Sequence, residues 1–181
     1  MNNFEINSKK FLSTSGMRTT YWGPNAWNFL FVSILGTYPE KINNNDKNHI
    51  RIKKEFKNLF NSLGYIMPCI YCRDSYKQFI KEMPVENSMS GRIELFTWLY
   101  NLKDKVNNKL IKQEKECFNT EKKKLDLLLK NNKINKIEYN NSINNVKEII
   151  FITKKSPSLI QVLKKYEVNR ASCSTKSKTC R

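Results

Sequence analysis

The sequence lacks several features that would place it in a membrane, in a secretory pathway or in a β fold. No run of about 18 apolar residues occurs, so no membrane-spanning helix is expected. Residues 1–10 lack the apolar stretch of a secretory signal. No segment alternates apolar and polar residues over enough length to indicate a strand, which leaves helices as the predicted structure. There is also only one histidine, His49.

The chain is strongly basic, with 33 Lys and Arg against 16 Asp and Glu and a formal net charge of +17. Such an excess raises nucleic acid as a partner. The positive charges are spread along the chain, however, and Lys and Asn together dominate the polar positions. We therefore expect no specific nucleic-acid partner, and a nonspecific affinity for acidic surfaces at low salt.

Two of the five cysteines are closely spaced, in the segment Pro68-Cys69-Ile70-Tyr71-Cys72. Pro68 predicts a helix start, with Cys69 in the first turn and Cys72 one turn deeper on the same side. The unpaired N–H groups and the dipole at a helix start favour a thiolate, so the pair suits a dithiol that opens and closes. A structural disulfide or half of a zinc site is equally consistent with this motif alone.

Four segments of the first 112 residues show helical apolar spacing, which predicts a small bundle of four helices. Gly23-Pro24 indicates the start of the first helix, Gly64 the end of the second, and Pro84 follows the third, which contains the cysteine pair. The apolar positions are Trp27, Leu30, Phe31, Ile34, Leu35 and Tyr38 in the first helix, Ile52, Phe56, Leu59, Phe60 and Leu63 in the second, Cys72, Tyr76, Phe79 and Ile80 in the third, and Leu95, Leu99, Leu102, Val106 and Leu110 in the fourth, flanked by Phe96 and Trp98.

From Glu114 the composition becomes rich in Lys and Asn. Apolar residues there predict two amphipathic helices with a turn near Asn131-Asn132, although Asn is a poor helix former and partial disorder is the alternative. Ser156-Pro157 predicts the cap and first residue of a last helix. We therefore divide the chain into a mobile N-terminal arm over 1–20, a bundle over 21–113, a helical extension over 114–168 and a flexible tail over 169–181.

Three pieces of the bundle, taken in order, resemble the Erv/ALR family of FAD-linked sulfhydryl oxidases from about Tyr21 to Cys117. A Lys- and Asn-rich chain of this kind is most similar to members from large DNA viruses. The pieces are Trp22-Gly23-Pro24 with Trp27 and Tyr38-Pro39, then the cysteine motif with Tyr76, and then Arg92 to Tyr100 with Val106-Asn107-Asn108-Lys109-Leu110.

This resemblance implies an all-α four-helix bundle that binds FAD, with the flavin ring beside the cysteine motif. Cys69 would be the outer sulfur that exchanges with substrate and Cys72 the inner one that faces the flavin. The enzyme would form disulfides in thiol-containing proteins or in a thioredoxin-like carrier, with oxygen as acceptor and hydrogen peroxide as product. We expect a homodimer in the cytoplasm, or in host cytoplasm and virion for a viral protein. By position, the cofactor contacts would be Gly23, Trp27, Phe31, Tyr38, Cys72, Asn101, Lys103, Val106, Asn107, Lys109 and Lys112.

The sequence departs from the family pattern at the adenine end of the expected cofactor site. Phe31 stands where the family usually has His, and Lys103-Asp104 stands where it has His-Asn. Phe31 can still stack on adenine, and Lys103 can pair with a phosphate or cover an aromatic plane. Asp104 near a pyrophosphate would be unfavourable unless a lysine neutralises it. With no histidine near the motif, a thiolate would depend on the helix start and on Arg73.

Cys173 and Cys180, in the tail, are either a second dithiol that relays electrons, as in relatives, or two unrelated cysteines. Cys117 belongs to neither cysteine pair.

Three other functions compete with the oxidase. The first is a flavin-free thioredoxin-like oxidoreductase, which needs a strand before the motif. The second is a zinc module that joins the two cysteine pairs, although we expect no metal. The third is a family member that has lost activity and acts as a binding protein.

Overall fold

The computed structural model describes residues 16–169, and in this range it contains α-helices, one short 3-10 helix and no strand, so the predicted all-α fold is confirmed. The described chain forms two compact units, one up to Leu102 and one from Lys103, and a single helix runs from the first into the second. The elements are α2 (Thr19–Thr37), α3 (Lys47–Ile66), α4 (Ile70–Glu82), η1 (Val85–Ser88), α5 (Arg92–Lys130), α6 (Lys136–Ile150) and α7 (Leu159–Glu167).

The first unit is the predicted bundle, and aromatic rings from different helices hold it together. The ring centroids of Phe31 in α2 and Phe96 in α5 lie 4.8 Å apart. Those of Phe60 in α3 and Trp98 in α5 are also 4.8 Å apart, in an edge-on arrangement. The Tyr76 hydroxyl in α4 donates to the Phe60 carbonyl oxygen at 2.8 Å. These contacts connect all four helices around one apolar core.

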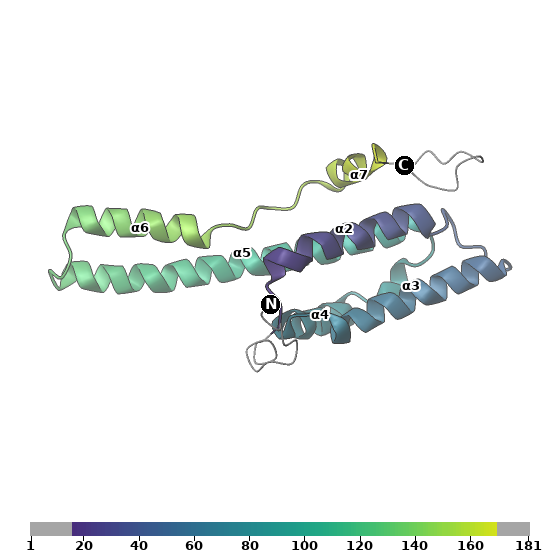
Figure 1. Ribbon diagram of the computed structural model, residues 1–181, viewed down its shortest axis with the longest axis horizontal. Coiled ribbons are helices and arrows are strands. Elements are labelled where there is room, and N and C mark those ends of the chain that lie inside the picture. Colours follow the sequence, from purple (N-terminus) through teal and green to yellow (C-terminus); the bar gives the residue numbers. More distant parts are fainter. Residues whose placement is uncertain (1–15, 170–181) are drawn as a thin grey trace, which may run out of the picture. The chain divides into compact units, whose positions relative to one another are not determined.

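The second unit contains the expected turn, at which the chain reverses after α5. Asn132 has φ 54°, a left-handed conformation that Asn tolerates. In Figure 1, α6 then runs back beside the C-terminal part of α5. The Tyr139 hydroxyl donates to the Asp126 carboxylate at 2.6 Å, and the rings of Phe118 and Phe151 lie 5.2 Å apart. The pair is thus a helical hairpin with polar and aromatic contacts between its arms.

The first helix begins earlier than predicted, because Gly23-Pro24 lies inside α2 and does not start it. Residues before the proline take part in contacts that hold the added turns, including a hydrogen bond from Trp22 Nε1 to the Met17 carbonyl oxygen at 3.1 Å. The C-terminal end of the expected N-terminal arm is therefore helical from Thr19. Residues 1–15 of that arm lie outside the described residues, as do residues 170–181 of the expected tail.

The predicted end of the second helix at Gly64 is wrong, since α3 continues to Ile66. Gly64 is buried where α3 meets α4, and a Cβ on it would stand 3.1 Å from Lys77 Cγ and 3.5 Å from Tyr76 Cδ1. The residue therefore allows the two helices to approach closely and does not act as a helix stop.

The predicted break between the fourth helix and the extension is also absent, since α5 is one helix of 39 residues. It contains neither Gly nor Pro, so nothing local interrupts it at the composition change near Glu114.

The last helix, α7, begins at Leu159 with Ser158 as its cap, two residues later than the predicted cap at Ser156. Ser158 and Gln161 form a reciprocal capping box there, which fixes the start.

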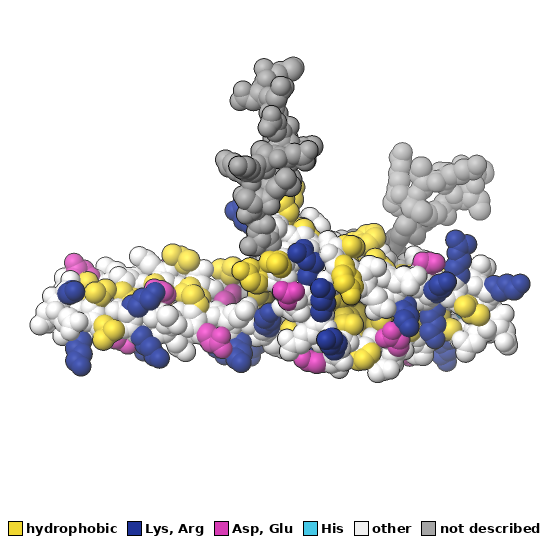
Figure 2. All heavy atoms as spheres, turned by 90° about the horizontal axis from the view of Figure 1, so that it is seen from below, with side chains coloured by type: hydrophobic (Ala, Val, Ile, Leu, Met, Phe, Trp, Pro, Cys, Tyr) yellow, Lys and Arg dark blue, Asp and Glu magenta, His cyan; other side chains and the backbone are white. Residues whose placement is uncertain are grey.

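Figure 2 shows Lys and Arg side chains spread along the described part of the face that it draws, with acidic side chains among them. Among the described helices, none combines the length and apolar character that crossing a membrane would require.

Candidate dithiol site

The cysteine motif lies at the start of α4, but the helix begins at Ile70, two residues later than the predicted start at Pro68. Cys69 is the N-cap residue, with an extended backbone at φ −135° and ψ 123°, and is not part of the first turn. Its Sγ accepts a hydrogen bond from the Cys72 backbone N–H at 3.4 Å. The Cys69 sulfur thus lies against the backbone of Cys72, at the helix end where unpaired N–H groups and the helix dipole favour negative charge on sulfur.

The residues before Cys69 are held by a segment that lies just before α2 in the sequence. The Met17 N–H donates to the Pro68 carbonyl oxygen at 2.6 Å, and Gly16 and Cys69 form an isolated antiparallel bridge. Gly16 has φ +110°, and a Cβ on it would lie 1.8 Å from the Pro68 oxygen. We call Gly16 and Met17 the strap. Sequence reasoning missed it, because only a glycine near the N-terminus hinted at it.

Arg73 holds the same turn from the side of α4. Its Nη1 donates to the Met67 carbonyl oxygen at 2.6 Å, and its backbone N–H donates to the Cys69 carbonyl oxygen at 3.1 Å. The guanidinium thus satisfies a carbonyl at the end of α3, where helix carbonyls lose their internal partners. Its observed bond is to the backbone, whereas the sequence suggested contact with a thiolate.

The expected cofactor residues of the first unit differ in accessibility. Phe31 and Tyr38 are enclosed in the core, with 1% and 0% of their surface exposed. The Tyr38 hydroxyl donates to the Met89 carbonyl oxygen at 2.8 Å, and burial raises the pKa of Tyr38 to about 12. Trp27 and Gly23, also in α2, are half-buried, and a Cβ on Gly23 would meet nothing within 4 Å. A planar ligand can reach the indole of Trp27 more directly than the two enclosed rings.

The expected cofactor residues of the second unit lie along α5. Lys103, Val106, Asn107 and Lys109 are half-buried and Lys112 is exposed. The pKa of Lys103 is lowered, first by burial and then by the positive charge of Lys165, with a smaller opposing effect of Asp104. The positive charges of Lys103 and Lys165 repel each other, and a bound phosphate would relieve that repulsion. Lys165, in α7, is therefore a candidate that sequence reasoning missed, since nothing in the sequence connected α7 with α5.

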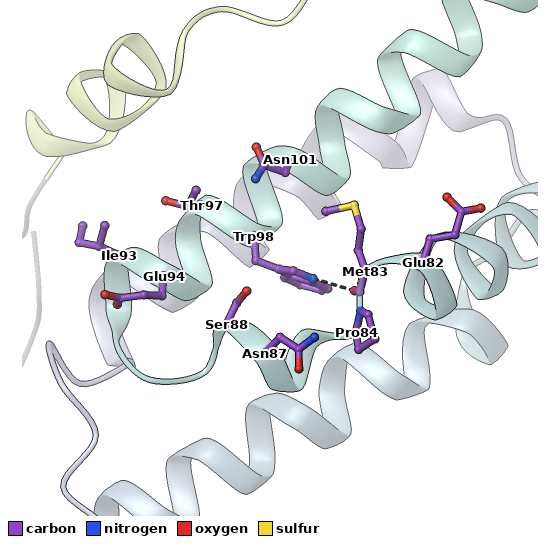
Figure 3. Close-up of a pocket in the computed structure, with 10 residues that line it drawn as sticks. All are labelled: Glu82, Met83, Pro84, Asn87, Ser88, Ile93, Glu94, Thr97, Trp98 and Asn101. Atoms are coloured by element: carbon purple, nitrogen blue, oxygen red, sulfur yellow. Dashed lines mark hydrogen bonds between the residues drawn. The ribbon is translucent and has the colours of Figure 1, made fainter.

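Asn101, the remaining expected cofactor residue, lines a hollow of about 480 Å³ in the first unit. Figure 3 shows this hollow between the end of α4, η1 and the first turns of α5, with Trp98 Nε1 donating to the Met83 carbonyl oxygen at 2.9 Å. Cys69 caps the opposite end of α4, which at 13 residues is about 20 Å long. Asn101 is therefore not brought next to the cysteines. Glu82 and Glu94 are among the residues that line the same hollow, and their negative charge disfavours a phosphate there.

Two competing interpretations can be compared with this geometry. A helix, α3, precedes the motif, whereas a thioredoxin-like fold requires a strand there. No group of three or more potential metal ligands occurs within residues 16–169. Cys173 and Cys180, which the zinc module and the electron relay both need, lie outside the described residues. Cys117 is exposed on α5.

Together, these features define the first unit as a helical bundle that presents two cysteines at a helix start, an arrangement that suits thiol–disulfide exchange. The Erv1/Alr family model matches residues 24–126, more than half of the chain. The protein belongs to the Erv1/Alr family.

Curated relatives agree with this assignment. The chain is 30% identical over 101 residues to the mitochondrial FAD-linked sulfhydryl oxidase ERV1 of Saccharomyces cerevisiae, covering 56% of this chain and 49% of that protein. It is 30% identical over 92 residues to the probable FAD-linked sulfhydryl oxidase of Acanthamoeba polyphaga mimivirus, covering 50% of this chain and 59% of that protein. The chain thus spans about half the length of these relatives. The crystal structure of the yeast Erv1 core matches with a TM-score of 0.44 at 25% identity, over 57% of this chain and 80% of that one.

Proposed function

We propose that this protein is an FAD-linked thiol oxidase that forms disulfide bonds in substrate proteins. One observation carries the proposal. In a member of the Erv1/Alr family, Cys69 caps α4 and its Sγ lies 3.4 Å from the backbone nitrogen of Cys72. Both cysteines are half-buried, and neither is enclosed in the core. The family supplies the expectation of a redox dithiol, and the local geometry suits one.

In the proposed reaction the two cysteines start as a disulfide. A substrate thiolate attacks Cys69 Sγ, the bond between Cys69 and Cys72 breaks, and Cys72 leaves as a thiolate. That thiolate forms at the start of α4, where the helix dipole stabilises it. A second substrate thiolate then attacks the substrate sulfur of the mixed disulfide and releases Cys69. The substrate has lost two electrons and two protons, and the dithiol has gained the electrons.

FAD, when bound, supplies the two-electron acceptor that returns the dithiol to a disulfide, with oxygen as final acceptor and hydrogen peroxide as product. The side chains of α5 fit part of such a group, because the half-buried Lys103, beside Lys165, provides positive charge for a pyrophosphate. The half-buried Trp27 can stack on a flat ring. The residues proposed to hold FAD are those expected from the resemblance, namely Gly23, Trp27, Phe31, Tyr38, Cys72, Asn101, Lys103, Val106, Asn107, Lys109 and Lys112.

The test is to purify the full chain, to measure bound flavin, and to follow oxygen uptake with dithiothreitol as thiol donor. We expect a yellow protein whose oxygen uptake depends on thiol and disappears in Cys69→Ser and in Cys72→Ser. Cys117→Ser is the matched control, since it removes an exposed cysteine outside the motif and should retain full activity. A colourless protein that cannot be reconstituted with FAD would refute the proposal.

A second candidate function is a binding protein that has lost oxidase activity. The observation in its favour is the enclosure of Phe31 and Tyr38, two of the aromatic residues expected to contact the cofactor. It predicts a colourless protein in which Cys69→Ser has no effect on partner binding.

Two further proposals concern the oxidase. It is a homodimer, which light scattering measures, and it acts in the cytoplasm, or in host cytoplasm and virion for a viral source.

A further inference from the structure

Five large apolar side chains around the cysteine motif are exposed, and we call them the collar. Two of them end α3, two lie within the motif at the first turn of α4, and one belongs to the strap. The collar consists of Tyr65, Ile66, Ile70, Tyr71 and Met17, whose exposed surface fractions are 74%, 65%, 43%, 71% and 49%.

Other large apolar side chains are also exposed, such as Phe29 in α2 and Ile149 in α6, but the collar differs from them in its position beside the cysteine motif. Four of its members lie within four residues of Cys69 in the sequence, and the fifth, Met17, is bonded to Pro68. The five residues therefore belong to the segments that meet at Cys69. Exposed apolar groups that gather at one place mark binding surfaces, and aromatic and aliphatic side chains dominate the centres of protein interfaces.

Positive charge borders the collar. Lys77 Nζ lies 4.8 Å from the centroid of the Tyr65 ring. Arg18 is exposed next to Met17, and Arg73 follows Cys72 directly. Asp74 is the one acidic residue between Met67 and Lys81. The edge of the collar thus carries a net positive charge, which favours acidic groups in whatever covers it.

We propose that the collar docks a cysteine-containing segment of a reduced polypeptide, in which apolar residues flank the cysteine and acidic residues lie further out. The inference rests on the proposed function, because a substrate thiol must then come to Cys69 Sγ, and the chain that carries it must cover the collar. Apolar side chains of the segment would bury Ile66 and the collar tyrosines, while its acidic side chains would face Lys77 and Arg18.

Helix α3 provides a matched pair of positions for the test. Ile66 and Ile50 are both isoleucines on this helix, exposed by 65% and 48%. They are 16 residues apart in the numbering, which is about 24 Å along the helix. Ile66→Ser removes apolar surface next to Cys69, whereas Ile50→Ser makes the same chemical change at the other end of α3. Both positions are exposed, so neither change should affect folding strongly.

The first experiment uses the full-length protein and three reduced thiol substrates. These are dithiothreitol, a peptide whose two cysteines are flanked by Leu and Phe with Glu further out, and the same peptide with Ser in place of Leu and Phe. We expect the wild type to oxidise the apolar peptide with the higher kcat/KM. Ile66→Ser should lower that value about fivefold and leave dithiothreitol and the Ser peptide unchanged. Ile50→Ser should change none of the three.

The second experiment does not depend on oxidase activity. The protein used in it carries Ser in place of Cys72, Cys117, Cys173 and Cys180, so that Cys69 is its one thiol. The Cys69 thiolate attacks a peptide whose cysteine is activated as a disulfide with thionitrobenzoate. A bond forms between Cys69 and the peptide sulfur, the original disulfide breaks, and coloured thionitrobenzoate leaves. The rate of thionitrobenzoate release is compared between the apolar and the Ser-flanked peptide. The comparison is made with and without Ile66→Ser, and it reports docking without any oxidase step. We expect about a fivefold preference for the apolar peptide, lost in Ile66→Ser.

The outcomes separate the two proposals. If dithiothreitol is not oxidised but Cys69 still prefers the apolar peptide, the oxidase proposal fails and the docking surface stands. If dithiothreitol is oxidised but both peptides react equally in both experiments, the docking inference is overturned and the oxidase proposal stands. An equal effect of Ile66→Ser and Ile50→Ser would also overturn the docking inference. Replacing the outer Glu by Lys should slow the apolar peptide, and an unchanged rate would contradict the role of the positive rim.

Discussion

Replacing Gly16 by alanine tests the strap, the contact by which the N-terminal segment holds the cysteine motif. Gly16 has φ +110°, and a Cβ there would overlap the Pro68 carbonyl oxygen at 1.8 Å. Keeping the strap in place would cost about 1–3 kcal/mol in backbone strain alone, before the overlap is counted. The variant should instead release the strap and lose its hydrogen bonds.

The cost of release follows from the bonds that the strap makes. Met17 donates to the Pro68 oxygen at 2.6 Å and accepts from Trp22 Nε1 at 3.1 Å. Each hydrogen bond contributes about 0.5–1.5 kcal/mol net. We therefore expect Gly16→Ala, which loses both bonds, to lower the free energy of unfolding by about 1–3 kcal/mol. Gly36→Ala is the matched control, because Gly36 lies in α2 with nothing within 4 Å of its Cβ position. It should stabilise the protein by about 0.5–1 kcal/mol, since alanine suits a helix better than glycine.

Urea denaturation measures both changes, and hydrogen exchange of the Met17 amide locates the effect of Gly16→Ala. The two alanine variants should shift stability in opposite directions, and only Gly16→Ala should increase exchange at Met17. If Gly16→Ala is as stable as the wild type and its Met17 amide exchanges at the wild-type rate, then the close approach of Gly16 to Pro68 does not exist in solution. The account of how Cys69 is held extended would then fail with it.

Three further predictions concern other parts of the chain. Burial raises the pKa of Tyr76 above its ordinary 10.0, so the protonated hydroxyl contributes stability that is complete below pH 10 and is lost as the pH rises above it. Tyr76→Phe should cost about 1 kcal/mol in urea denaturation at pH 7 and should weaken the loss of stability above pH 10. Asn135→Ala removes a capping box at the start of α6 and should cost about 1 kcal/mol, with faster hydrogen exchange in the first turn of α6. If Cys173 and Cys180 form a relay, replacing both by Ser should slow oxidation of a protein dithiol and spare dithiothreitol in the same oxygen-uptake assay, and equal activities would refute the relay.

The helical stripes could be predicted from the sequence because the buried residues repeat at helical spacing. Phe31, Phe60, Tyr76, Leu95 and Leu99 were all predicted apolar-face positions and are all buried. Such spacing is a local property of the sequence, and burial of one face of a helix needs no knowledge of its partner. The all-α fold and the four-helix bundle follow from these stripes.

The errors occurred where contacts between distant segments decide local structure. Pro68 normally favours the first helical position, but Cys69 pairs with Gly16 and stays extended, and the helix starts two residues later, at Ile70. Gly64 looked like a helix end, but it serves close packing against Tyr76. Neither partner can be identified from the neighbouring sequence, so propensity alone gives the wrong boundary.

In the candidate site, too, local features could be predicted from the sequence and contacts between distant segments could not. The spacing of Cys69 and Cys72 predicts that both lie at the start of one helix, and in the structure the Cys72 backbone N–H donates to Cys69 Sγ there. Lys165 could not be found, because its effect on Lys103 depends on where α7 folds. The enclosure of Phe31 likewise depends on Phe96, which is far along the chain.

The central claim is that electrons from a thiol reach bound FAD through Cys69 and Cys72. The most direct measurement is flavin absorbance of the purified full-length protein, mixed without oxygen with dithiothreitol. The account predicts rapid bleaching in the wild type and in Cys117→Ser, and almost none in Cys72→Ser. A flavin that bleaches equally fast in Cys72→Ser, or a protein that binds no flavin, would contradict it.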